Sequence, residues 1–321
     1  MSLYASVTKM NFLLGVLIQG LAYSFLAIGI SLTYKILNTA DLTVDGSFPL
    51  GAVVGAVCLI SGIPIPIALV LAFIAGALAG LITSWLHVKL KIQPLLSGIL
   101  TMSGLYTINL LVGGNRSNIP VFQSSTLFTL PSWFPVEFSR FYPLLILSIL
   151  VMIAKLSVDW FLRTKRGYML RVAGDNPQLV ISLGEDLGKY KYLGLALSNA
   201  IIAMGGAIVM MLSRFYDLSM GSGMLVIGLA SVVLGDTLLQ SSGAKVTTMA
   251  IAGSILYRFS VAVALLLNLH PSYLRLLTVI IFVIAIVSKQ SSLKHFLQTI
   301  GGSLNASSNK YPEIISSKHA K

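Results

Sequence analysis

Long apolar segments separated by short polar ones dominate this chain. A helix that crosses the hydrocarbon core of a bilayer needs about 20 mainly apolar residues. By this measure the sequence predicts membrane-spanning helices near 11–34, 45–60, 65–87, 92–112, 141–162, 192–213, 223–241, 246–267 and 272–288. The segment 45–60 is short and has Pro49 in its first turn, which is typical of a broken or re-entrant helix. We therefore expect an all-α polytopic membrane protein with about 8–10 transmembrane helices.

One polar island interrupts this pattern at residues 163–192. Long uncharged stretches flank it, so a chain that leaves the membrane here displays a surface to a soluble partner. Asp175 or Asn176 can cap a short helix that has Pro177 at its first position. That helix would run to about Leu183 and end at Gly184. The alternative is an interfacial helix that lies on lipid headgroups.

The composition indicates that most of the chain is embedded in a lipid bilayer. The 321 residues are 56% hydrophobic and 10% charged, whereas soluble domains are about 25% charged. The net charge of +12 lies in short loops and the tail, which excludes a nucleic-acid-binding face. Most of the 22 Lys and Arg residues fall on the side of the island, so we place that side in the cytoplasm. The N-terminus is then outside, unless the segment 45–60 is re-entrant. The segment 11–34 is too long for a signal peptide and is predicted to be a retained span.

The two halves of the chain resemble each other at a nearly constant offset. The stretch DLTVDG at 41–46 resembles DLSMGS at 217–222, an offset of 176, and 74–76 matches 251–253 at an offset of 177. On the predicted topology the first stretch is inside and the second outside, so the repeat is inverted. Inverted repeats are typical of transport proteins, with the pathway near the repeat interface.

We expect one permease domain over 11–288, followed by a cytoplasmic tail at 289–321. The domain would comprise repeat one at about 11–112, a connector span at 141–162, a cytoplasmic coupling loop at 163–191 and repeat two at about 192–288. The external loop 113–140 is either a docking surface, an outer gate or an inert connection.

A few polar residues inside the spans are candidates to line a pathway. A charge at the bilayer centre is costly, so Arg258 should face a cavity or a partner, or else snorkel or pair with Asp236. Lys155 and Asp159 have the spacing of a local pair on one helix. The pathway candidates are Asp41, Asp45, Asn109, Asn199, Asp236 and Arg258.

The sequence lacks the patterns of an enzyme. The four His residues are scattered without ligand spacing, so no metal site is predicted. The single cysteine, Cys58, allows no disulfide within the chain. No Ser/His/Asp arrangement stands out, and no G-x-x-x-x-G-K-[ST] stretch is present, so the chain does not hydrolyse ATP through a P-loop.

Several stretches resemble the permeases of branched-chain amino-acid and ribose ABC importers. These are GYMLRVAGDNP at 167–177, LG at 183–184, YLGLALSNA at 192–200 and GLAYSFLAIGISLTY at 20–34. The family's coupling helix maps onto Gly174, Asp175, Asn176, Pro177, Leu179, Val180, Leu183 and Gly184. The stretch at 41–46 departs from the branched-chain members and is similar to a subgroup that includes tryptophan- or tyrosine-linked permeases.

The resemblance implies a type II-like ABC importer permease in the bacterial inner membrane. It implies two permease copies, as a homo- or heterodimer, with a cytoplasmic ATPase pair that binds the ATP and an extracytoplasmic solute-binding protein. No cofactor is expected in this chain, and the solute would be an amino acid or a related compound. A stand-alone secondary transporter with inverted repeats is the alternative, and it would need ionisable groups near the bilayer midplane.

Overall fold

The computed structural model describes residues 2–132, 134–239 and 242–266, and beyond them residues 273, 276, 278–280, 282 and 283. Its α-helices are α1 Ser2–Ser31, α2 Val44–Ile60, α3 Ile65–Val88, α4 Pro94–Val112, α5 Tyr142–Phe161, α6 Lys165–Asp175, α7 Pro177–Ser182, α8 Leu187–Ser213, α9 Met224–Leu239 and α10 Val246–Leu266. Short elements complete it: the π-helix η1 Leu32–Ile36, the 3-10 helices η2 Val136–Phe141 and η3 Leu218–Gly221, and the strands β1 Asn118–Pro120 and β2 Phe215–Asp217. The predicted tail and most of the predicted span at 272–288 lie outside the described residues.

The prediction of an all-α polytopic membrane protein is confirmed. Within the described residues, seven helices are long and apolar enough to cross a membrane, and α2 is a shorter apolar helix of 17 residues. Eight of the nine predicted spans thus correspond to helices, with ends that differ by a few residues. The short two-stranded sheet was not predicted, because two three-residue strands leave too little alternation to read.

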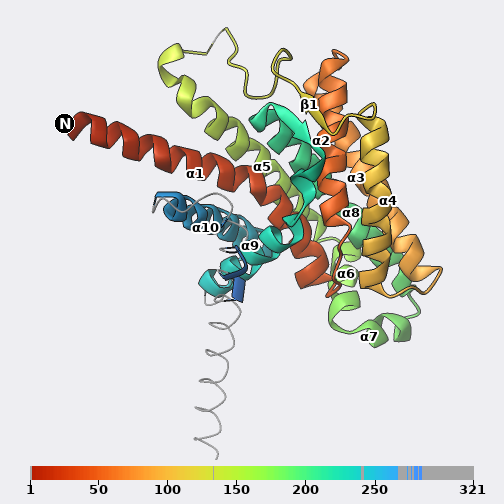
Figure 1. Cartoon of the computed structure of the whole chain (residues 1–321). Helices are drawn as coiled ribbons and strands as arrows, with labels where there is room; N and C mark the ends of the chain where they lie inside the picture. Colours follow the sequence, from red (N-terminus) through yellow and green to blue (C-terminus); the bar gives the residue numbers. More distant parts are fainter. Residues whose placement is uncertain are drawn as a thin grey trace, which may run out of the picture.

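Helix α8 packs against both α2 and α3, which also contact each other (Figure 1). Small residues allow these backbones to approach closely. A Cβ added at Gly51 of α2 would overlap the Ala203 carbonyl oxygen of α8, and one at Gly80 of α3 would overlap the Leu195 carbonyl oxygen. In a bilayer, helix association depends on such close packing, because the hydrophobic effect does not drive helices together in lipid.

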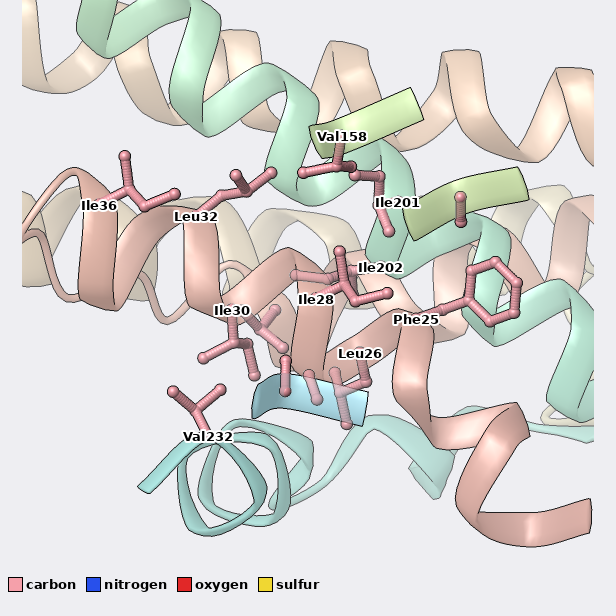
Figure 2. Packing of buried hydrophobic residues seen from close by; sticks show 14 of the residues in the cluster. Phe25, Leu26, Ile28, Ile30, Leu32, Ile36, Val158, Ile201, Ile202 and Val232 are labelled. Carbon is pink, nitrogen blue, oxygen red and sulfur yellow. The ribbon is translucent and has the colours of Figure 1, made fainter. Parts of the chain in front are cut away.

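A second group contains α1, α9 and α10. Gly235 of α9 faces the Met249 carbonyl oxygen of α10 with no room for a side chain. Helix α1 joins the two groups, as Figure 2 shows: Ile28 and Phe25 lie toward α8, whereas Ile30 lies toward Val232 of α9. The apolar core is therefore continuous across both halves of the chain.

The two ends of the bundle differ in structure (Figure 1). At one end, β1 from the loop 113–140 pairs antiparallel with β2, with Ile119 opposite Tyr216. The helices α6 and α7 lie at the other end, beside the end of α1. Strand β1, from the loop predicted to be external, thus lies at the end of the bundle that faces away from the basic island. Burial, and then the neighbouring Asp217, raises the pKa of Tyr216 to about 12.

Corresponding positions of the predicted repeat share a local structure. Asp41 Oδ1 accepts a hydrogen bond from Thr43 N at 2.9 Å, and Asp217 Oδ1 accepts one from Ser219 N at 2.8 Å. Each carboxylate thereby fixes the turn before a short helix, α2 in the first half and η3 followed by α9 in the second. The inverted repeat remains a prediction, and these matching turns support it.

Candidate coupling surface and transport pathway

The polar island folds as two helices, whereas the sequence analysis expected one. Thr164 caps α6, since its Oγ1 accepts from Gly167 N at 3.3 Å. The extended backbone of Asn176, with φ −146° and ψ 85°, then separates α6 from α7. Asn176 also caps α7, accepting from Leu179 N at 3.1 Å, and Pro177 holds the first helical position as predicted. Helix α6 was not predicted, because its basic sequence lacks the helical periodicity of apolar residues.

Helix α7 presents apolar side chains on the surface. Leu179, Ile181 and Leu183 are 44%, 61% and 59% exposed. Val180, another of the coupling-helix candidates, has a fully buried side chain that anchors α7 to the bundle core. Gly184 ends the segment with φ +73°, which favours glycine. Asp175, Asn176 and Pro177 are exposed on the same segment.

Gly174 has a different position from the other coupling candidates. A Cβ at Gly174 would overlap the Ile36 carbonyl oxygen at the end of η1. The absence of a side chain at this position therefore lets α6 lie directly against η1, the continuation of α1. This backbone contact gives a direct mechanical connection from α7, through α6, to a long helix of the bundle.

Two of the pathway candidates, Asp41 and Asn199, form one buried hydrogen-bond network between the halves. Asn199 Nδ2 donates to Asp41 Oδ2 at 2.7 Å, and Ser47 Oγ donates to Asn199 Oδ1 at 2.7 Å. Burial raises the pKa of the Asp41 carboxyl above its ordinary value, and hydrogen bonds from Thr43 and Asn199 oppose that shift. All three side chains of the network are at most 2% exposed, so it serves to fix the start of α2 against α8.

We expect Asn199→Leu to destabilise the protein strongly. The substitution leaves Asp41 Oδ2 and the Ser47 hydroxyl without their partner, so the free energy of unfolding should fall by about 3 kcal/mol. Thermal unfolding of the detergent-solubilised protein measures the loss. Ser103→Ala removes one exposed hydrogen bond within α4 and should change stability by less than about 0.5 kcal/mol. Equal melting temperatures for both variants would contradict the network's structural role.

Asp45 lies where α2 meets the beginning of α9. Its Oδ2 accepts from Gly223 N at 3.0 Å and its Oδ1 accepts from Leu225 N at 2.8 Å. The carboxylate thus satisfies two backbone donors at the N-terminus of a helix from the other half of the chain. Asn109 of α4 donates through Nδ2 to the Gly46 carbonyl oxygen at 3.1 Å. Both side chains line a cavity of about 510 Å³.

Asp236 and Arg258 do not pair with each other, as one of the alternatives for Arg258 had allowed. Asp236 forms an ion pair with Lys35 of η1. The Arg258 guanidinium lies over the Tyr23 ring, 3.5 Å from its centroid, and its buried Nε has no hydrogen-bond partner among the described residues. A cation on an aromatic face is a favourable arrangement away from water.

Asp159 takes part in more than the local pair that the sequence analysis assigned to it. Besides Lys155 Nζ at 3.5 Å, it accepts from Lys245 Nζ at 2.9 Å and from Thr247 Oγ1 at 2.6 Å. The cluster ties the end of α5 to the start of α10. Residues 86 and 88 positions apart carry no sequence signal for such a contact.

Comparisons with known proteins agree with this architecture. The family described as "Branched-chain amino acid transport system / permease component" matches residues 12–286. The chain belongs to this family. A tyrosine transport system permease protein of Clostridioides difficile is 40% identical over 85% of this chain and 90% of that protein. An uncharacterized protein of Rickettsia prowazekii is 31% identical over 87% of this chain and 98% of its own length.

A more distant relative extends the range of named functions. The autoinducer 2 import system permease protein LsrD of Escherichia coli is 26% identical over 71% of this chain and 70% of that protein. Family membership and seven apolar helices among the described residues together make this chain a multi-pass permease of the membrane, which in bacteria is the inner membrane. The predicted family and location are therefore confirmed.

Proposed function

We propose that this chain is the membrane subunit of an ATP-driven importer for an amine-bearing solute such as an amino acid. The observation that carries the proposal is the exposed apolar surface of α7, capped by Asn176 and anchored by Val180. An amphipathic helix with exposed leucines suits a groove on a soluble partner, here an ATPase pair that would bind the ATP. The relative named as a tyrosine transport permease supports an amino-acid solute.

Transport would follow from a rigid connection between the partner and the bundle. Helix α7 is anchored by Val180 in the same apolar core that holds α1 and α8. The backbone contact of Gly174 with Ile36 makes α6 move together with the end of α1. Closure of the ATPase pair would therefore shift one half of the bundle against the other, between outward- and inward-open states. Nucleotide shifts the equilibrium toward the state that it binds more tightly, by the difference between its binding free energies for the two states.

The complete importer would contain a second permease copy, either identical or homologous, and an extracytoplasmic binding protein. The face of α4 that bears Ser103, Tyr106 and Thr107 is exposed in the single chain. Polar side chains inside a membrane usually face a protein or a water-filled cavity, so this face is suited to the second copy and the pathway.

Affinity purification in mild detergent tests the proposal. Membranes from cells that express the tagged chain are solubilised, and the proteins that co-purify with the chain are identified by mass spectrometry. We expect a stoichiometric ATPase, and a variant with Leu179→Asp should lose it while the chain is still recovered. Good recovery of the wild-type chain alone would favour the stand-alone secondary transporter instead.

A further inference from the structure

We propose that the cavity beside Asp45 and Asn109 is a binding site for the ammonium group of the transported solute. This inference rests on the proposed function, which it makes more specific. The cavity has a volume of about 510 Å³ and is lined by α2, α4, η3 and the residues that follow η3. Its polar lining consists of Asp45, Ser103, Tyr106, Asn109, Ser219 and Ser222.

An unsatisfied acceptor is the first argument for a ligand. Asn109 is 1% exposed, and its Oδ1 has no hydrogen-bond partner among the described residues. The amide orientation is fixed, because Nδ2 donates to the Gly46 carbonyl oxygen. A buried oxygen without a donor costs about 1–3 kcal/mol. A ligand that supplies an N–H donor would recover that cost.

The charge of the cavity selects the kind of donor. The described lining contains one charged side chain, that of Asp45. Each Asp45 oxygen already accepts one backbone N–H, and a carboxylate oxygen can accept more than one. An ammonium group offers three donors and no acceptor, so it matches Asp45 and Asn109 together. An anionic group placed at Asp45 in place of the ammonium group would meet repulsion.

The position of the cavity fits a solute that arrives from outside. Ser219 and Ser222 follow β2, which lies at the end of the bundle opposite α6 and α7. The Tyr106 side chain is 59% exposed and offers an aromatic face near the same opening. The hydrogen bonds of Asp45 to the N-terminus of α9 give Asp45 a structural role. They give no structural reason for the buried Asn109 Oδ1 that lacks a donor.

Thiol protection tests the site in membrane vesicles. Ser103→Cys places a thiol in the cavity, and Cys58→Ala removes the single native thiol. We expect a cationic methanethiosulfonate, bearing trimethylammonium, to label position 103 about tenfold faster than an anionic one bearing sulfonate. Equal rates, or faster labelling by the anionic reagent, would overturn the charge assignment.

Two matched pairs of compounds then test the ammonium group itself. L-tyrosine and L-leucine should slow the labelling about fivefold or more, which corresponds to appreciable occupancy of the site. Their counterparts without the amine, 3-(4-hydroxyphenyl)propionate and 4-methylpentanoate, should leave the rate unchanged. Protection by neither amino acid, or equal protection by the counterparts, would overturn the proposal.

A variant and a matched control test whether Asn109 accepts a hydrogen bond from the ammonium group. Asn109→Leu should abolish the protection, whereas Asn118→Leu, on β1 outside the cavity lining, should retain it. If Asn109→Leu fails to insert into the membrane, the proposal is still tested in the protein that retains Asn109. The test there is the ratio of the labelling rates of the cationic and anionic reagents at position 103. ATP-driven uptake without any protection would reject the site and leave the proposed function intact. Purification without an ATPase would reject the proposed function.

Discussion

We expect the replacement of Leu179 and Leu183 together with aspartate to abolish ATP-driven uptake while the permease still inserts into the membrane. Both side chains are exposed, and Leu183, the residue that caps the C-terminus of α7, lies one turn after Leu179. In the complex that we propose, each would be buried in an ATPase groove, where an unpaired charge is costly. We expect uptake in proteoliposomes to fall at least about 100-fold, which requires only ~2.7 kcal/mol of lost coupling.

The conservative variant at the same positions is the control. Leu179→Met with Leu183→Met preserves the apolar surface and should retain uptake within about twofold, because volume-conserving apolar changes are well tolerated. The melting temperature of the aspartate variant should equal that of the wild type, since neither position is buried in the single chain. Normal uptake by the aspartate variant would show that α7 does not transmit the motion.

Gly51→Ala is expected to prevent stable assembly of the bundle. The added Cβ would overlap the backbone of Ala203, at the point where α2 and α8 are in closest contact. Neither backbone can retreat without separating two helices that pack through most of α2, so we expect a loss of about 3 kcal/mol or more. Size-exclusion chromatography and thermal unfolding in detergent measure the loss.

Gly104→Ala provides the matched substitution. It lies within α4, and a Cβ there would have no atom within 4 Å. Alanine favours a helix interior over glycine by about 0.5–1 kcal/mol, so this variant should be as stable as the wild type or slightly more stable. A similar loss for both variants would mean that glycine at position 51 is not required by packing.

The helices could be predicted because each span satisfies its backbone hydrogen bonds within one segment. Length and hydropathy alone therefore placed α3, α4 and α8, and Asn176-Pro177 gave the cap of α7. The ends of α1 were less accurate, because its helix continues beyond the apolar segment and ends in a π-helical turn.

The residues of the candidate sites were only partly predictable. Asp41, Asp45, Asn109 and Asn199 were selected as polar residues in an apolar context. Each of them has a partner more than 60 positions away, such as Gly46 for Asn109 and Leu225 for Asp45. Polarity in a span predicts that a partner exists, but the helix packing decides which partner it is.

The sequence by itself determined that this chain is a polytopic permease with a capped helix between two membrane segments. That information is local, since it depends on apolar length, capping residues and a family pattern. The tertiary structure decided that Val180 is buried, that Gly174 packs on Ile36, and that Asp45 caps a helix from the other half. Such contacts follow from how close two helix backbones can come, a property of both surfaces together that neither segment encodes alone.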